Sequence, residues 1–247
     1  MPRPTPFRPD GGVLVVVPAY NEAAALPATL AEISSCAPGV DVLVVDDGST
    51  DDTRLVARGR GVPVLVLPFN LGVGGAVRAG YRYALRCGYG AVVQVDADGQ
   101  HDPADVERLV AGLAEANVVV GARFADRGTF ETSRARRLAM TLLARTISTI
   151  ARHRLTDTTS GFKAVDRKAL AFYAANFPAE YLGDTVEALV MGARAGLVIR
   201  QVPVEMRQRR AGTPSQRSWK AGLYLGRAVV ALFMALIRRQ PALETAS

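Results

Sequence analysis

The chain has 247 residues, 49% of them apolar, which excludes an intrinsically disordered protein and allows one large buried core. Its formal net charge is +7 and its isoelectric point is about 9.8, which favours anionic partners such as phosphates, nucleic acid or an acidic membrane surface. No apolar run reaches the ~18 to 20 residues of a membrane span.

The first residues, 1–12, are rich in proline and lack an apolar stretch, so we expect a flexible segment and no signal peptide. The two cysteines, Cys36 and Cys87, have a spacing that fits neither a metal site nor a disulfide framework. Both fall within apolar helical patterns, which predicts buried, reduced thiols.

Short apolar runs alternate with helical patterns along the first half of the chain. These runs predict buried strands at Val13–Val17, Val40–Val45, Val62–Leu67, Ala91–Val95 and Val118–Val120. Helical patterns cover Ala23–Ser35 and the stretch after Gly75 up to Arg86. The alternation predicts an α/β fold with an open, mostly parallel sheet flanked by helices.

Polar or glycine-rich segments follow four of these predicted strands. They are Pro18–Glu22, Asp46–Asp47, Asn70–Gly75 and Asp96–Asp98. Ligands of open α/β sheets bind beyond the carboxyl ends of the strands, so we expect all four segments to converge on one crevice.

Two carboxylates, Asp96 and Asp98, stand one residue apart after a buried strand. Mg²⁺ or Mn²⁺ prefers oxygen ligands of this kind and keeps positions open for phosphate. Gln100 could add a carbonyl oxygen and His101 a nitrogen. The alternative is an ordinary turn before a helix that Asp102 caps.

The glycine-rich segment Asn70–Gly75 has neither the Lys-Ser/Thr of a Walker loop nor the spacing of a dinucleotide fingerprint. Its glycines, together with Gly80, could let a helix pack closely on the sheet, or they could lie near a nucleotide. The sequence leaves both interpretations open.

Five motifs occur in chain order: Val17-Pro18-Ala19-Tyr20-Asn21-Glu22, Val44-Val45-Asp46-Asp47-Gly48-Ser49-Thr50-Asp51, Asn70-Leu71-Gly72, Asp96-Ala97-Asp98-Gly99-Gln100-His101 and Thr158-Thr159-Ser160-Gly161-Phe162-Lys163. Together they resemble family 2 glycosyltransferases of the Rossmann-like GT-A fold. Within that family they resemble the branch of dolichol- and polyprenyl-phosphate mannose or glucose synthases. The resemblance covers residues 13–210, which we expect to form the catalytic domain.

The resemblance implies a nucleotide-sugar donor, a divalent cation (Mg²⁺ or Mn²⁺) and inversion at the anomeric carbon. Carried over by motif, the expected donor-binding residues are Pro18, Ala19, Tyr20, Glu22, Asp46, Asp96, Ala97 and Asp98. The expected metal ligands are Asp98 and Gln100, with Asp96 nearby or bound to ribose. A cation there would offset charge developing on the leaving diphosphate.

A basic segment runs from Arg123 to Arg154 and holds eight arginines but only two acids. Within it, Ser133–Ala151 predicts an amphipathic helix with the ladder Arg137, Thr141 and Arg145 opposite an apolar stripe. The pattern alone fits either a solvated basic face or a platform for an anionic acceptor or phospholipid head groups.

The resemblance favours the acceptor platform, because Arg123, Arg137 and Thr141 match the family's acceptor-phosphate positions. A phosphate monoester is largely dianionic at neutral pH, so it can attack the anomeric carbon without a strong base. We therefore expect Asp98, Arg123 and Arg137 to be the catalytic residues. If the acceptor were instead a saccharide or small-molecule hydroxyl, Asp184 or Glu187 on a predicted helix could be the base.

The last part of the chain carries a predicted strand, Val198–Val204, and then residues 211–247, a loop and a helix. The resemblance implies that Arg210 and Ser215 close over the donor diphosphate, although Thr213-Pro214 departs from the family pattern. The apolar segment Trp219–Arg239 contains Arg227 and is short for a span. It predicts an amphipathic or interfacial helix, or a helix docked on the domain.

These observations predict a metal-dependent, inverting glycosyltransferase that moves a hexose from GDP-mannose or UDP-glucose to a polyprenyl phosphate. We expect it to be peripheral on the cytoplasmic face of the membrane. A non-catalytic nucleotide- or nucleic-acid-binding protein is the alternative of another class. Nucleic acid is not an expected partner, because the basic helix lacks interleaved aromatic residues and the crevice is acidic.

Overall fold

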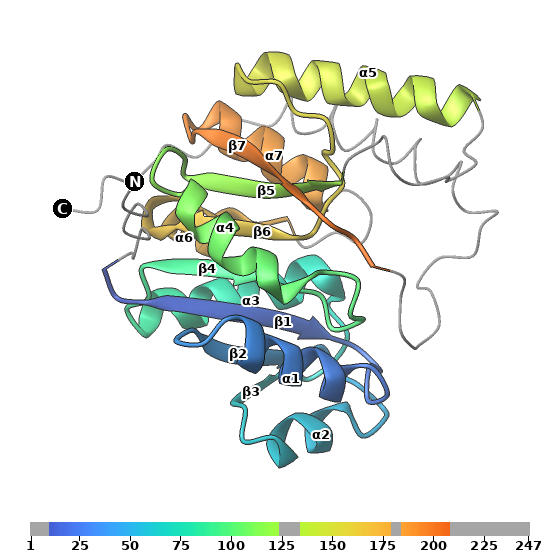
Figure 1. Cartoon of the computed structure of the whole chain (residues 1–247), viewed down its shortest axis with the longest axis vertical. Coiled ribbons are helices and arrows are strands. Elements are labelled where there is room, and N and C mark those ends of the chain that lie inside the picture. Colours follow the sequence, from blue (N-terminus) through green and yellow to red (C-terminus); the bar gives the residue numbers. More distant parts are fainter. Residues whose placement is uncertain (1–9, 124–133, 179–183, 208–247) are drawn as a thin grey trace, which may run out of the picture.

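The computed structural model describes residues 10–123, 134–178 and 184–207, and within it a seven-stranded sheet has the order β3-β2-β1-β4-β6-β5-β7 (Figure 1). The strands are β1 (Val13–Ala19), β2 (Asp41–Asp46), β3 (Val64–Val66), β4 (Ala91–Gln94), β5 (Val118–Arg123), β6 (Lys163–Asp166) and β7 (Ile199–Val204). All strand pairs are parallel except those that β6 makes with β4 and β5. The predicted mostly parallel sheet is confirmed.

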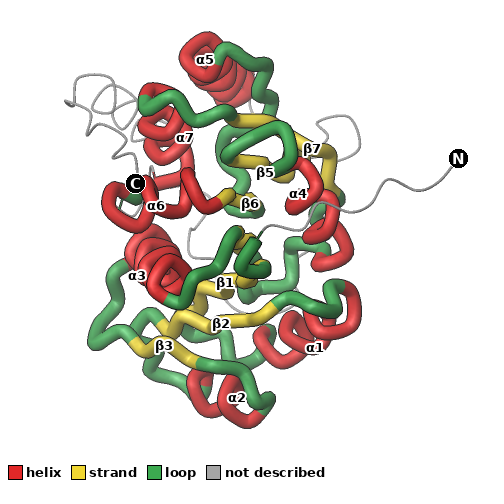
Figure 2. The backbone as a smooth tube through the Cα atoms, turned by 90° about the vertical axis from the view of Figure 1, so that its left-hand side faces the viewer, coloured by secondary structure: helices red, strands yellow, loops and turns green. Residues whose placement is uncertain are grey.

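The helices cover both faces of this sheet. They are α1 (Leu26–Cys36), α2 (Thr53–Gly59), α3 (Gly72–Arg86), the 3-10 turn η1 (Pro103–Asp105), α4 (Val106–Gly112), α5 (Arg134–Ala151), α6 (Arg167–Asn176) and α7 (Asp184–Arg194). The view along the strands in Figure 2 shows α1, α2 and α4 on one side, with α3, α6 and α7 on the other. None of the described helices is long and apolar enough to cross a membrane.

Alternate residues of the central strands face opposite helical layers. In β1, Leu14 and Val16 pack with α3, while Val15 and Val17 pack with α1 and α4. Since both faces are covered, the strand is apolar throughout rather than alternating with polar residues. This two-sided burial explains why the parallel strands are recognisable as continuous apolar runs.

The structure differs from the sequence prediction at both cysteines. Cys36 and Cys87 are free, as expected, but both are exposed rather than buried. Cys36 is the last residue of α1 and Cys87 caps α3, so each lies at the carboxyl end of its helix. The apolar pattern of a helix does not show which of its terminal residues face solvent.

Helix α3 packs against β1 through Gly80. A Cβ atom built on Gly80 would lie 2.5 Å from Cγ1 of Val16, and Val16 is fully buried. The close approach of helix and sheet therefore requires glycine at this position, as one of the two interpretations of the glycine-rich region predicted.

We predict that Gly80→Ala lowers the free energy of unfolding by about 1–3 kcal/mol, the usual cost of overpacking a core. Gly59→Ala is the matched control, because a Cβ at Gly59 meets no atom within 4 Å. That control should be neutral or stabilising by up to about 1 kcal/mol. Equal unfolding midpoints in urea for the two variants would contradict the packing role of Gly80.

Candidate active site

The carboxyl ends of β1 and β2 form the first part of the site. Ala19 stands opposite Asp46 in the parallel register, and the backbone N–H of Asp47 donates to the Ala19 carbonyl at 2.9 Å. Pro18 and Ala19 are buried, while Tyr20 is 43% exposed. Two of the predicted donor-binding segments therefore lie side by side at one edge of the sheet.

The Asp46 carboxylate is fully buried at this edge. Its Oδ1 accepts a hydrogen bond from the Ser49 N–H at 3.1 Å, and its Oδ2 lies 3.5 Å from Nε of Arg54. Among the described residues, nothing donates a hydrogen bond to Oδ2. A buried acceptor without a donor is costly, so this oxygen is suited to an N–H or O–H of a bound ligand.

The loop after β1 is held by the loop after β2. Asn21 has a left-handed backbone (φ 55°), its N–H donates to Ser49 Oγ at 3.0 Å, and its Oδ1 accepts from the Thr50 N–H at 2.9 Å. The Glu22 N–H donates to Thr53 Oγ1 at 2.9 Å. These hydrogen bonds fix Tyr20 and Glu22, two predicted donor-binding residues, relative to Asp46.

Asp47 connects the same edge to the glycine-rich segment, since its Oδ1 accepts from the Leu71 N–H at 2.7 Å. Gly48 has φ +72°, and a Cβ there would lie 2.8 Å from the backbone of Phe69. The start of α3 is thereby drawn against the end of β2. A direct nucleotide contact by Gly72–Gly75 stays a prediction.

The loop after β4 carries the two predicted metal-ligating carboxylates. Asp98 is 8% exposed and accepts from the Gln100 N–H at 3.0 Å, while the Asp96 side chain is 36% exposed. Thr29 of α1 donates to the Ala97 carbonyl at 2.9 Å. The backbone of this loop is thus anchored to α1, and the Asp96 side chain is partly open to solvent.

His101 supports this loop from beneath. Its Nδ1 accepts from the Asp96 N–H at 3.0 Å, so we assign the proton of the neutral ring to Nε2, which lies 3.6 Å from Asp96 Oδ2. The ring is 2% exposed and stacks on Phe162 with a centroid distance of 4.7 Å. These contacts describe a histidine held by the backbone of the loop, whereas the sequence analysis considered it as a nitrogen ligand.

Gln94 is a site residue that the sequence analysis missed. Its Nε2 donates to Asp96 Oδ1 at 3.1 Å, and it is 3% exposed at the end of β4. A signal was present, because Gln94 is the one polar residue in the run Ala91–Val95 and shares a strand face with Asp96. Gly161 leaves room here, since a Cβ would lie 3.2 Å from Asp96 Oδ2.

The residues of this loop fit a hard divalent cation held together with a ligand. Asp96 and Asp98 offer carboxylate oxygens, and Gln100 offers an amide oxygen. Within the described part of the chain, no three His, Cys, Asp or Glu side chains gather in one metal-binding group. A cation here would therefore depend on ligand oxygens, such as those of a diphosphate, to complete its coordination.

Arg207 ties the segment after β7 to this loop. Its guanidinium pairs with Asp102 at 2.7 Å and with Glu32 of α1 at 2.8 Å, and its N–H donates to the Gln100 carbonyl at 2.9 Å. His101 and Met206 also form an isolated antiparallel bridge. The loop is consequently tied both to α1 and to the segment after β7.

The predicted acceptor residues are only partly described. Arg123 ends β5 at the same sheet edge, and Arg137 lies in α5, but their side chains fall outside the described residues, as does all of Arg210 and Ser215. Thr141 is exposed on α5. On α7, Glu187 is 8% exposed, while the Asp184 side chain is not described.

The sequence profile of glycosyl transferase family 2 matches residues 14–173. The chain belongs to family 2 of the glycosyltransferases. It is 35% identical over 229 residues to an undecaprenyl-phosphate mannosyltransferase of Micrococcus luteus, covering 88% of this chain and 91% of that protein.

A polyprenol monophosphomannose synthase of Mycolicibacterium smegmatis is 35% identical over 178 residues, 68% of this chain and 66% of that protein. Glucosyl-3-phosphoglycerate synthase of Mycobacterium tuberculosis, solved with Mg²⁺ and uridine diphosphate, is 25% identical with a TM-score of 0.68, over 90% of this chain and 78% of that chain. These findings confirm the GT-A fold and the branch predicted from the motifs.

Asp47 and Asp51 have pKa values shifted in opposite directions, so their substitution should change stability with opposite signs. Burial raises the pKa of Asp47, and the charge of Asp46 adds to this, against hydrogen bonds from Leu71 and Gly72. The charged side chain therefore opposes folding at neutral pH. Asp47→Asn should raise the thermal midpoint at pH 7, and the gain should vanish as the pH falls below the raised pKa.

Asp51 is the control for this pH series. Burial acts to raise its pKa, but hydrogen bonds from Thr53 and Ala23 outweigh it and lower the pKa. Asp51→Asn should therefore cost stability at pH 7, and the cost should fade as the pH drops through the lowered pKa. Thermal midpoints of both variants between pH 7 and pH 3 test the pair, and changes of the same sign would contradict the assignment.

Removal of the ion pairs that Arg207 makes with Asp102 and Glu32 should make the loop that carries Gln100 less rigid. We predict that Arg207→Ala weakens Mn²⁺-dependent binding of a nucleoside diphosphate by about tenfold, or ~1.4 kcal/mol. Arg108→Ala is the control, because Arg108 pairs with Asp105 and bonds to the Pro203 carbonyl of β7 without touching this loop. Equal affinities of the two variants, measured by calorimetry, would show that Arg207 has no positioning role.

Proposed function

We propose that this glycosyltransferase moves a hexose from a nucleotide sugar to the phosphate of a polyprenyl phosphate at the cytoplasmic face of a membrane. The observation that carries the proposal is the meeting of Asp46 and the Asp96–Asp98 loop at one edge of the sheet. A buried acceptor for the nucleoside and an acidic loop for a cation are what a nucleotide-sugar site requires. The names of the two curated relatives favour mannose and a polyprenyl acceptor.

The donor would lie across the ends of β1, β2 and β4. Asp46 would accept from the nucleoside, and the fixed loop of Tyr20 and Glu22 would enclose it. Asp98, Gln100 and Asp96 would hold Mg²⁺ or Mn²⁺, which supplies positive charge to the leaving diphosphate when bound. Gln94 and His101 would keep the Asp96 carboxylate in one orientation.

The acceptor phosphate would approach from the end of β5 and from α5. Arg123 and Arg137 suit it because a guanidinium can donate to two phosphate oxygens at once. A dianionic phosphate attacking the anomeric carbon from the face opposite the leaving group inverts that centre. The protein then has to position the nucleophile rather than deprotonate it.

A second candidate is transfer to a small phosphorylated acceptor through its hydroxyl group. The solved glucosyl-3-phosphoglycerate synthase structures include complexes with phosphoglyceric acid. A hydroxyl nucleophile needs a base, and Glu187, buried near the start of α7, would be its candidate together with Asp184. A non-catalytic binding protein, the third expectation, does not fit membership of this enzyme family.

The proposed domain division places catalysis in residues 13–210 and a membrane-facing loop and helix in residues 211–247. Residues 1–9 and 208–247 lie outside the described part of the chain, so these boundaries are proposals from the sequence. Arg210 and Ser215 keep their proposed role at the donor diphosphate.

The acceptor group is tested by comparing polyprenyl phosphate with polyprenol, both dispersed in detergent. We predict transfer only to the phosphate. Arg137→Ala should weaken acceptor binding by ~1.5–3 kcal/mol, the range for hydrogen bonds to charged groups, with little change in donor binding. Arg86→Ala, which removes an exposed arginine at the carboxyl end of α3, is the control. Equal transfer to the free alcohol would establish a hydroxyl nucleophile and reject the proposed chemistry.

A further inference from the structure

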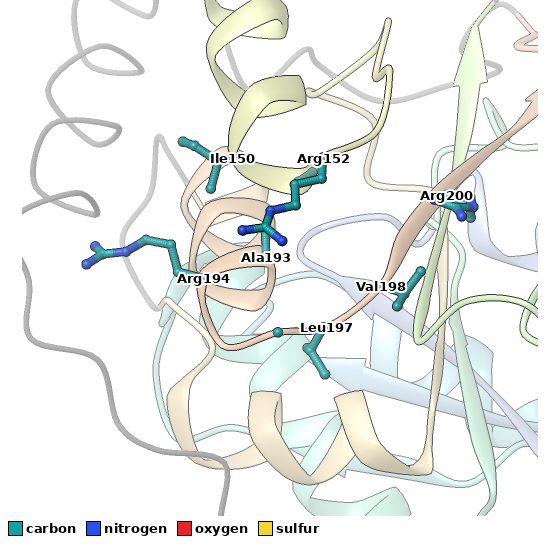
Figure 3. Close-up of a pocket in the computed structure, with 9 residues that line it drawn as sticks. Ile150, Arg152, Ala193, Arg194, Leu197, Val198 and Arg200 are labelled. Carbon is teal, nitrogen blue, oxygen red and sulfur yellow. The ribbon is translucent and has the colours of Figure 1, made fainter.

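A hollow of about 630 Å³ lies where α5 and α7 end and β7 begins (Figure 3). Its lining includes Ile150, Arg152, Arg194, Leu197, Val198 and Arg200. Strand β7 runs parallel to β5, which points the same way as β1 and β4, so the amino end of β7 is at the opposite sheet edge from Asp46 and Asp98. The hollow is therefore separate from the proposed donor site.

The charged residues that line this hollow are all basic. Three arginines from three elements line it, and none of the described lining residues is acidic. In Figure 3, Arg152 lies across the end of α7 beside Ala193, with Arg194 on one side and Arg200 on the other. Within the described ranges, neither Arg152 nor Arg200 has a carboxylate or carbonyl partner, whereas Arg54, Arg78 and Arg207 are all held by oxygen atoms.

Helix dipoles do not account for all of this charge. The carboxyl ends of α5 and α7 each carry roughly half a negative charge, or about one in total. The guanidinium groups of Arg152 and Arg200 alone exceed that by about one positive charge. Arg200, moreover, lies on a strand and not at a helix end. The hollow is electropositive beyond what its two helix ends would neutralise.

The backbone of Arg152 supplies an independent observation. Arg152 follows α5 with φ 51°, a left-handed conformation that usually favours glycine or asparagine at this position. The neighbouring helix α7 is followed by Gly196, with φ 82°, in the corresponding place. Arginine therefore stands at a strained helix end where glycine would fold more easily, which is a pattern associated with functional positions.

The exposed side of α5 leads to this hollow. Thr141, Arg145, Thr149 and Arg152 are all exposed and follow each other at intervals of three or four residues. Ile147, on the opposite side of the helix, is fully buried. A polar and basic helix face thus ends in a pocket with both guanidinium groups and apolar walls.

We propose that this hollow binds the headgroup phosphate of an anionic phospholipid, and so docks α5 and the α7–β7 corner on the membrane. Guanidinium groups match phosphate oxygens, and Ile150, Leu197 and Val198 offer apolar contact to the glycerol and the start of an acyl chain. The proposal rests on the proposed function only because a polyprenyl acceptor requires the enzyme to work at a membrane.

The test uses the full chain and flotation with vesicles of phosphatidylcholine, with and without phosphatidylglycerol. The double variant Arg152→Gln/Arg200→Gln should lose about tenfold or more of its partition onto anionic vesicles. Arg58→Gln/Arg60→Gln removes the same charge from exposed positions beside α2, at the other end of the sheet, and should change partition less than twofold. Equal losses in the two variants would reduce the effect to net charge and overturn the proposal.

Glycerol 1-phosphate provides the soluble arm of this experiment. If low concentrations of it shift the thermal midpoint of the parent protein and displace it from anionic vesicles, the hollow takes a free phosphate ester and the lipid assignment is wrong. Sugar transfer by the parent protein to detergent-dispersed polyprenyl phosphate is scored separately. Its failure alongside intact vesicle binding would reject the proposed function but not this site.

Arg152→Gly gives a second, sharper readout. Glycine relieves the left-handed backbone, so the thermal midpoint should rise, while the lost guanidinium should lower partition onto anionic vesicles. A purely structural arginine would not give these opposite signs. A variant that is more stable and binds vesicles as the parent does would overturn the proposal.

Discussion

The parallel pairing of β1 with β2 and β4 is the constraint on which the site depends. Parallel strands end at the same sheet edge, so the register that places Ala19 opposite Asp46 also brings the Asp96–Asp98 loop to that edge. Three loops far apart in sequence thereby gather at one edge of the sheet. Their mutual hydrogen bonds, such as Asn21 to Ser49 and Thr29 to Ala97, then fix the positions that the strands alone would only approximate.

Much of the fold could be predicted from the sequence, because parallel strands that are buried on both faces form continuous apolar runs. The strands β1, β2 and β4, the polar segments after them and the helix over Arg134–Ala151 follow from pattern and period. The antiparallel strand β6 was not predicted, since four residues in a segment of ordinary composition carry little periodic signal. The predicted burial of Cys36 and Cys87 was wrong, because the apolar pattern of a helix does not show which of its terminal residues face solvent.

The contacts that support the site were harder to predict from the sequence than the motifs that form it. Gln94 and His101 hold Asp96 through distances and ring orientation that depend on how β4, η1 and Phe162 pack together. Arg207 reaches Asp102 and Glu32 across more than a hundred residues of sequence. A motif names the residues that meet the ligand, whereas these partners are set by the tertiary fold.

Metal-dependent nucleotide binding is the central claim, and calorimetry of GDP and UDP with and without Mn²⁺ tests it most directly. The parent protein should bind one of the two nucleotides far more tightly with Mn²⁺, and Asp98→Asn should lose that gain while keeping its thermal midpoint. Asp41→Asn, at the start of β2 and the opposite sheet edge, should retain it. An unchanged Mn²⁺ dependence in Asp98→Asn would contradict the placement of the donor site at the ends of β1, β2 and β4.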